Sequence, residues 1–397
     1  MSYRILALDG GGTWALIQVK ALIALYNEDP STPGQTVLKD FDLVAANSGG
    51  SIVLGALLEN LALGEILNLF SDEATRKSIF SKTDSLGDRM LHDLTGMGPK
   101  YSAQNKLPAL QHVFSEKGNI PLNKVAVGLR RPDSNVDLHL LIIAFDYDRN
   151  RAAFLRSSPA SGPSWGKGET SDVTLAEAIH ASTNAPVNYF DSPATFPDRP
   201  GRYWDGAITG CNNPVLAAVT EAIATGQQPT DIVALSLGTA TVALPWPQPG
   251  EAPSPYTQAV SDPGIATDLH KLATSILDDP PDIATYLAHI MTGSGIGLNR
   301  PQADSRIIRM NPLISPVGSP GAWSAPGAMT GDQFTYLANL DMDAVEQSEV
   351  DAISRFADLW LKNAARNQPL RMNADTLEPE LGQATFAAAE AAWKALQ

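Results

Sequence analysis

A serine-containing turn joins two apolar segments near the amino terminus. Residues 46–50 have the sequence Ala-Asn-Ser-Gly-Gly; they follow the apolar run 41–45 and precede the helix-like run 51–58. A small-x-Ser-x-Gly sequence between a buried strand and a helix exposes a nucleophilic serine, and it needs small residues because the two backbones approach closely. Ala46 stands where the motif usually has glycine. The pattern predicts either a nucleophile turn at Ser48 or a turn whose serine only caps the helix.

A second strand-to-helix turn lies at residues 9–13, with the sequence Asp-Gly-Gly-Gly-Thr. Apolar residues 3–8 predict a buried strand before it, and helical periodicity follows over residues 14–22. Consecutive glycines leave backbone N–H groups uncovered at the positive end of the helix dipole, where an anion is stabilised. An oxyanion is favoured over a phosphate, because the P-loop pattern and the spaced dinucleotide-binding glycines are both absent. A tight turn without a ligand is the alternative.

A third turn contains an aspartate. Asp205 follows the aromatic pair Tyr203 and Trp204 and precedes Gly206. A carboxylate in such a turn is usually solvated or bonded to its own backbone. Its position after the two glycine-containing turns changes this interpretation.

These three turns occur in the order glycine loop, serine, aspartate, and in this order they resemble the patatin-like phospholipase family of lipid acyl hydrolases. Residues 175–190 look like the family's helix leading into an Ala-Pro turn. Residues 232–239 look like its following strand, with a Leu-Gly-Thr ending. The resemblance covers residues 3–240, and nothing beyond them resembles the family.

The resemblance implies a catalytic dyad of Ser48 and Asp205 that works without a histidine, a metal or a cofactor. It also implies an oxyanion hole built from backbone N–H groups of the glycine loop and of the residue after the serine. These donors are Gly10, Gly11, Gly12 and Gly49. The six histidines lie outside the motifs; His180 comes nearest, on a helix face typical of a packed or surface histidine.

One position departs from the family pattern. Where the family usually has an arginine and then a glycine after its glycine loop, this chain has Trp14 and Ala15. The missing cation leaves open whether substrate and loop are held in the usual way. We interpret Trp14 as a substrate-binding residue that forms an apolar wall near the acyl group, with a core tryptophan as the alternative.

Asp205 would have to act as a base. Serine is a poor nucleophile at its free pKa, so a base must take its proton as it attacks a carbonyl carbon; water then hydrolyses the resulting acyl-enzyme. The unperturbed pKa of an aspartate, about 3.9, makes an exposed one a weak base. We therefore expect a desolvated carboxylate without a neutralising cation close by, shielded by Tyr203 and Trp204.

Strand-like and helix-like runs alternate along the chain, as in residues 3–25 and 41–60. This alternation predicts an α/β fold with a mostly parallel central sheet covered by helices on both faces, patatin-like. We divide the chain into a patatin-like catalytic core (1–240), a Pro-rich loop (241–264) and a mainly helical C-terminal region packed on the core (265–397). A separate binding module is the alternative for the last part.

The formal net charge of −15 and the pI of about 4.8 argue against nucleic-acid partners and against steady attachment to anionic membranes. A lipid or acyl-ester substrate is compatible with this charge, because an apolar patch can contact a membrane or micelle surface transiently. The loop tryptophans Trp165, Trp246 and Trp323 are candidates for such a patch. The sequence does not indicate the oligomeric state.

No apolar run approaches the length of a membrane span, and the amino terminus lacks the basic and apolar regions of a signal peptide. We therefore predict a soluble, cytoplasmic protein, with secretion without a cleaved signal left open. Its single cysteine, Cys211, rules out an internal disulfide.

The predicted function is a serine acyl hydrolase that cleaves fatty-acyl ester bonds of phospholipids or related lipids. One alternative is a carboxylesterase or thioesterase acting on small acyl esters. Another is a catalytically weak lipid-binding regulatory protein with the same fold. Head group, acyl length and positional preference depend on pocket shape, which the sequence does not specify.

Overall fold

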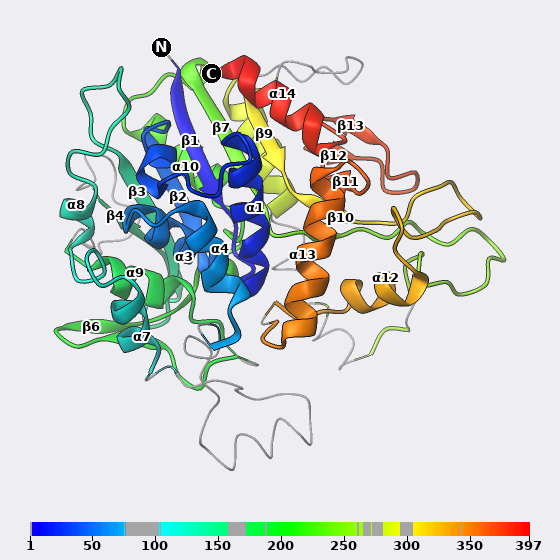
Figure 1. Ribbon diagram of the computed structural model, residues 1–397, viewed down its shortest axis with the longest axis horizontal. Helices are drawn as coiled ribbons and strands as arrows, with labels where there is room; N and C mark the ends of the chain where they lie inside the picture. The colour runs from blue at the N-terminus through cyan, green and yellow to red at the C-terminus, as the bar shows by residue number, and fades with distance from the viewer. Residues whose placement is uncertain are drawn as a thin grey trace.

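The computed structural model describes residues 2–74, 76, 103, 105–157, 172–186, 189–259, 262–264, 271, 281–293, 305–342 and 344–397. Within these residues, the centre of the molecule is a sheet of eight strands with helices on both faces (Figure 1). The predicted α/β fold with a mostly parallel, helix-covered central sheet is therefore confirmed.

Most of the central sheet is parallel. Neighbouring strands run parallel in the order β3, β2, β1, β7, β9, whereas β4, β5 and β6 are antiparallel to the strands they pair with. The bounds are β1 Tyr3–Leu8, β2 Leu43–Asn47, β3 His139–Asp146, β4 Arg151–Arg156, β5 Ala194–Phe196, β6 Arg199–Asp205, β7 Ile232–Leu237 and β9 Ile307–Met310.

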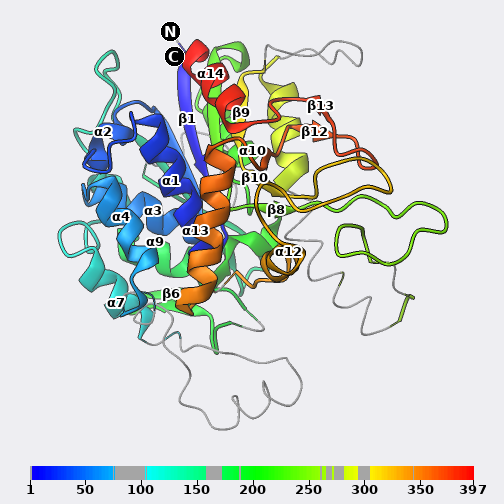
Figure 2. The same cartoon turned by 45° about the vertical axis from the view of Figure 1, so that its right-hand side comes forward.

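Strand β1 shows why helices cover both faces of the sheet. Leu6 and Leu8 belong to one apolar cluster and Ile5 and Ala7 to another, and all four side chains are fully buried. Such strands, apolar on both faces, are typical of parallel sheets. Helices α1, α3, α4, α9 and α13 contribute to the first cluster and α10 to the second (Figure 2).

The larger helices are α1 Leu16–Leu25, α3 Ser48–Leu58, α4 Leu63–Ser71, α9 Leu175–Ser182, α10 Val215–Ala224, α13 Gln347–Leu361 and α14 Phe386–Leu396. Shorter helical segments are η1 Gly12–Ala15, α2 Gly34–Leu38, α7 Lys106–Val113, α8 Leu122–Val125, η2 Gly206–Thr209, η3 Pro229–Asp231 and α12 Gly331–Ala338.

Strand β3 brings together two turns that are far apart in the sequence. Its residues 139–143 pair with β2, and Ala144 then pairs with Asp205 of β6. Because β4 occupies the opposite edge of β3, β2 and β6 share one edge and lie end to end. The turn after β2 and the carboxyl end of β6 therefore meet where the parallel strands end.

The C-terminal region adds strands as well as helices. Strand β9 extends the central sheet beside β7, where Ile307, Ile308 and Met310 are buried. Residues 265–397 were expected to be mainly helical; their described part contains α12, α13 and α14 together with β9 to β13. The small strands are β8 Thr241–Val242, β10 Pro312–Ile314, β11 Arg366–Asn367, β12 Arg371–Met372 and β13 Pro379–Leu381.

The loop tryptophans differ in exposure. Trp246 is 56% exposed, Trp323 is half-buried, and Trp165 lies outside the described residues.

None of the described helices combines the length and the hydropathy that crossing a bilayer requires.

Candidate active site

Ser48 has a backbone conformation that serine rarely adopts. Its φ of +46° lies in the left-handed region, at the first residue of α3 and directly after β2. Such strain is concentrated at functional sites. The turn is also tight: a Cβ on Gly50 would lie 2.4 Å from the carbonyl oxygen of Leu8. Close packing thus requires a glycine two residues after the serine.

The Ser48 side chain interacts with a carboxylate. It stabilises the ionised form of Asp205 and so lowers the pKa of that carboxyl group. The N-cap residue of α3 is Asn47, whose side chain makes no capping hydrogen bond. Oδ1 of Asp205 also accepts the N–H of Ala207 at 2.9 Å and Nδ2 of Asn47 at 3.2 Å. The structure thus brings Ser48 and Asp205 together, with Asn47 as a partner that the sequence motif contains but does not assign.

Burial controls the protonation of Asp205, which is only 4% exposed. Removal from water raises its pKa above the usual value of 3.8. Hydrogen bonds from Ser48, Ala207 and Asn47, and the attraction of Lys106, lower the pKa only in part. A carboxylate with a raised pKa binds a proton more readily, which is the property that a base requires.

A buried lysine that the sequence analysis did not identify acts on Asp205. Lys106 is 1% exposed; its Nζ donates to the carbonyl oxygen of Thr183 at 2.6 Å and lies 3.8 Å from the centre of the Phe190 ring. From the sequence we expected no neutralising cation close to Asp205, but the attraction of Lys106 lowers the pKa of that carboxyl group. Burial lowers the pKa of Lys106 well below 10.5 and so favours the neutral amine, which neutralises Asp205 less than an exposed lysine would.

The C-terminal end of α9 contacts both parts of the site. Oγ of Ser182 accepts the N–H of Ser48 at 2.9 Å, and the carbonyl oxygen of Asn184 accepts the N–H of Asp205 at 2.9 Å. His180, one turn earlier, is buried; burial first, and Lys106 second, lower its pKa to about 3. It is an uncharged, packed histidine. The α9 end therefore fixes the backbone positions of both Ser48 and Asp205.

The glycine loop lies directly against the serine turn. A Cβ on Gly49 would lie 2.5 Å from the carbonyl oxygen of Gly12, and one on Gly10 would lie 2.9 Å from Cβ of Ser48. Gly12 has a φ of +54°, which favours glycine. Neither the loop nor the serine turn could hold this approach with larger residues.

The backbone N–H groups of the loop differ in what they bind. That of Gly10 donates to the carbonyl oxygen of Asn212 at 2.9 Å. Those of Gly11 and Gly12 have no acceptor among the described residues, and neither has that of Gly49 in the first turn of α3. Of the four predicted donors, Gly11, Gly12 and Gly49 are therefore the ones available to an anion.

Trp14 is 6% exposed and belongs to the larger apolar cluster. Its indole N–H donates to the carbonyl oxygen of Asp341 at 3.0 Å. Its role as a wall near an acyl group stays a prediction.

In the described part of the chain, no group of three or more His, Cys, Asp or Glu residues could hold a metal ion.

The fold and the site define a class of α/β proteins that have a serine on a strand-to-helix turn, a glycine loop beside it and a buried acid next to it. Comparison with protein families narrows the class. The model of the patatin-like phospholipase family matches residues 6–219, which is more than half of the chain, and the chain belongs to this family. Membership confirms the resemblance and supports a lipid acyl hydrolase of the esterase type.

Solved structures also match the chain. VipD from Legionella pneumophila aligns with a TM-score of 0.37 and 11% sequence identity, over 90% of this chain and 67% of the VipD chain. A search of curated protein sequences found no match.

Proposed function

We propose that this protein hydrolyses fatty-acyl ester bonds of phospholipids or related lipids, with Ser48 as the nucleophile and Asp205 as the base. The observation that carries the proposal is the meeting of a serine in a strained backbone conformation, φ +46°, with the buried Asp205. Asn47, the residue before the serine, donates to the Asp205 carboxylate at 3.2 Å, and the Ser48 side chain lowers the pKa of that carboxyl group. Both residues lie in the part of the chain that matches the family model.

The reaction proceeds through an acyl-enzyme. Asp205 accepts the Ser48 proton as Oγ attacks the carbonyl carbon, and it returns the proton to the departing alcohol oxygen. Asp205 then takes a proton from water as the water oxygen attacks the acyl carbon, and it gives this proton to Oγ of Ser48 as the acyl–Oγ bond breaks and the fatty acid leaves. The donors on Asp205, from Ala207 and Asn47, hold the carboxylate in place during both steps.

Negative charge develops on the carbonyl oxygen during each attack. The N–H groups of Gly11, Gly12 and Gly49 are the proposed donors to this oxygen, because none of them has another acceptor among the described residues. Removing one such donor costs about 3 kcal/mol of transition-state stabilisation.

We propose that the protein contacts its lipid substrate through an apolar surface. Val242, Trp246 and Tyr336 are 45%, 56% and 46% exposed. Val242 and Trp246 follow β7, whose carboxyl end lies beside the glycine loop. The net charge of −15 disfavours anionic bilayers, so we expect zwitterionic or neutral lipids to be the better substrates.

The test is a time course of fatty-acid release from phosphatidylcholine vesicles and of product release from a short p-nitrophenyl ester. Wild type, Ser48→Ala and Asp205→Asn are compared, with Asp29→Asn, at an exposed loop aspartate, as the matched control. We expect hydrolysis of both substrates by wild type and the control, and loss of both activities in the two site variants at a melting temperature no lower than that of wild type.

Three other outcomes separate the alternatives. Cleavage of the short ester alone would indicate a carboxylesterase, and preference for a short acyl thioester would indicate a thioesterase. No cleavage by wild type, together with binding to vesicles, would indicate a lipid-binding regulatory protein. Undiminished cleavage by Ser48→Ala would remove Ser48 as the nucleophile.

A further inference from the structure

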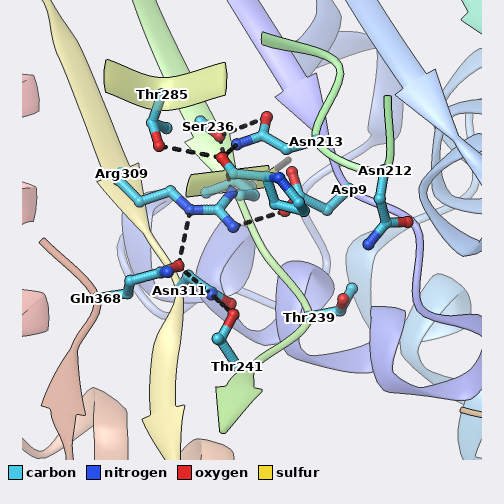
Figure 3. A network of polar contacts seen from close by, with 12 residues as sticks. Asp9, Asn212, Asn213, Ser236, Thr239, Thr241, Thr285, Arg309, Asn311 and Gln368 are labelled. Carbon is cyan, nitrogen blue, oxygen red and sulfur yellow. Dashed lines mark hydrogen bonds and ion pairs between the residues drawn. The ribbon is translucent and has the colours of Figure 1, made fainter. Parts of the chain in front are cut away.

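A buried arginine from the C-terminal region reaches the start of the glycine loop. Arg309 lies on β9 and is 2% exposed. Its guanidinium donates to Oδ2 of Asp9 at 2.6 Å, to Oγ of Ser236 at 2.8 Å and to Oε1 of Gln368 at 3.4 Å. Figure 3 shows Arg309 between these three side chains, which come from three different segments of the chain.

Asp9 depends on Arg309. Within the described residues, no other group donates a hydrogen bond to its carboxylate, and its second oxygen, Oδ1, is buried without a partner. Asp9 is itself 2% exposed, so water does not replace the guanidinium. Arg309 therefore sets the position of the Asp9 side chain.

The position of Asp9 affects the glycine loop because Gly10 follows it directly. The Asp9 N–H and carbonyl oxygen are bound by Leu237 and by Gln18, which fix the end of β1. The Gly10 carbonyl oxygen accepts Oγ1 of Thr239. Arg309 restrains the side chain of Asp9, the first residue after β1. Only Gly10 separates Asp9 from Gly11, whose N–H is a proposed oxyanion donor.

Arg309 is in turn held by residues beyond the matched family segment, 6–219. Oε1 of Gln368 also accepts Nδ2 of Asn311 at 2.6 Å, and Gln368 donates to Asp282. This second layer comes entirely from the C-terminal region. The region is thus built into the base of the proposed active site.

We propose that Arg309 is a positioning residue that holds Asp9 and thereby aims the N–H groups of Gly11 and Gly12 at the developing oxyanion; this rests on the proposed function. Without the guanidinium, Asp9 loses its partner and the loop gains freedom. A displacement of about 1 Å at such a site costs about 100-fold in turnover.

The test compares Arg309→Met, Arg309→Lys and Arg131→Met in the full chain. Arg131 is the matched control, because it is 5% exposed and bonds Asp42 at 2.7 Å, directly before β2 at the opposite end of the strands. Two readouts are taken below the melting temperature of every variant. These are kcat and KM on the short ester, and the rate at which an alkyl fluorophosphonate, whose phosphoryl oxygen occupies an oxyanion hole, labels Ser48.

We expect Arg309→Met to lower kcat and the labelling rate about 100-fold with KM little changed, and Arg309→Lys to regain part of both. Arg131→Met should lose thermal stability while keeping the wild-type kcat. Equal kcat in Arg309→Met and Arg131→Met would overturn the positioning role and leave the proposed function standing. No hydrolysis by wild type would overturn the proposed function and the inference with it.

Discussion

Asp9 and Asp205 are both buried carboxylates, but the groups that surround them differ in charge. Both side chains are nearly inaccessible, and burial raises the pKa of both. Asp9 faces the guanidinium of Arg309, which is always charged, and its pKa is still raised to about 6. Asp205 faces a hydroxyl, an amide, a peptide N–H and the amine of Lys106, whose pKa burial lowers.

This difference is consistent with the positioning role proposed for Asp9 and with the role of base proposed for Asp205. A permanent cation 2.6 Å from Asp9 fixes the side chain and opposes its protonation. Neutral donors around Asp205 orient the carboxylate and leave it able to accept a proton from Ser48. Two aspartates of similar burial are therefore suited to the different roles proposed for them, because the charges of their partners differ.

The largest expected effect separates the reactive carboxylate from its structural surroundings. Asp205→Asn keeps the shape but cannot accept a proton, so we expect ester hydrolysis to fall on the order of 10⁴- to 10⁶-fold. The melting temperature should stay equal or rise, because a raised pKa means that the fold disfavours the ionised form of Asp205. Steady-state kinetics and thermal unfolding measure both; retained turnover would contradict the assignment of the base.

The glycine loop should show the next largest effect. A Cβ on Gly12 would lie 2.5 Å from the carbonyl oxygen of Met342, so Gly12→Ala must displace the loop, and we expect kcat to fall about 10²- to 10³-fold. Gly128→Ala is the control, because Gly128 also has a positive φ, +81°, with nothing within 4 Å of its Cβ position. A wild-type kcat in Gly12→Ala would exclude the loop as the oxyanion hole.

The free energy of unfolding should distinguish the two buried basic residues, Arg309 and Lys106. Arg309→Met leaves Asp9 buried and unpaired, and we expect the free energy of unfolding to fall by about 3–5 kcal/mol. Lys106→Met removes an amine whose charged form burial disfavours. The carbonyl oxygen of Thr183 keeps the N–H of Ala185 as a donor, so we expect a cost of about 0.5–1.5 kcal/mol. Urea unfolding measures both; an equal loss would mean that removing Lys106 costs as much as removing the partner of a buried ion.

A second comparison within the same experiment tests the Asp9 pair. The double variant Asp9→Asn/Arg309→Met removes both charges, and we expect it to regain most of the stability that Arg309→Met loses. The reason is that the pKa of Asp9 is raised even beside Arg309. The free-energy cost of burying the charged carboxylate therefore exceeds the stabilisation that it gains from Arg309.

The local parts of this arrangement could be predicted from the sequence. The serine turn and the glycine loop each lie within a few residues, and small residues between a strand and a helix have few structural meanings. Asp205 was identified through its order in a family pattern, not through its own turn. Its contact with Ser48 depends on β6 continuing the edge of β3 that β2 leaves.

The partners of the two carboxylates could not be predicted. Arg309 meets Asp9 across 300 residues of chain, and Lys106 meets Thr183 across 77. A lone cation in an apolar run carries no local signal of what it will face, and β9 is a strand of only four residues. Only the packing of the C-terminal region against β7 places Arg309 beneath the loop.

The pH dependence of turnover should identify which aspartate limits activity in acid. Protonated Asp205 cannot accept the Ser48 proton, so kcat/KM should rise about tenfold per pH unit up to the raised pKa of Asp205, above the usual range near 4. Lys106 lowers that pKa, so Lys106→Met should move the acid limb to higher pH. Burial is the main cause of the raised pKa of Asp9, and the charged groups that act on it are Arg309 and Asp282 rather than Lys106, so an unmoved acid limb would assign that limb to Asp9.

The smallest expected effect concerns the surface and leaves both carboxylates untouched. Trp246→Ser removes an exposed ring, and we expect vesicle hydrolysis to fall a few-fold while the short-ester kcat is unchanged, because only the lipid substrate needs contact with an apolar patch. Val136→Ser is the control: Val136 is 74% exposed and precedes β3, at the opposite end of the parallel strands. Equal losses in the two variants would mean that exposure alone, and not the location of Trp246 in the segment that follows β7, governs contact with lipid.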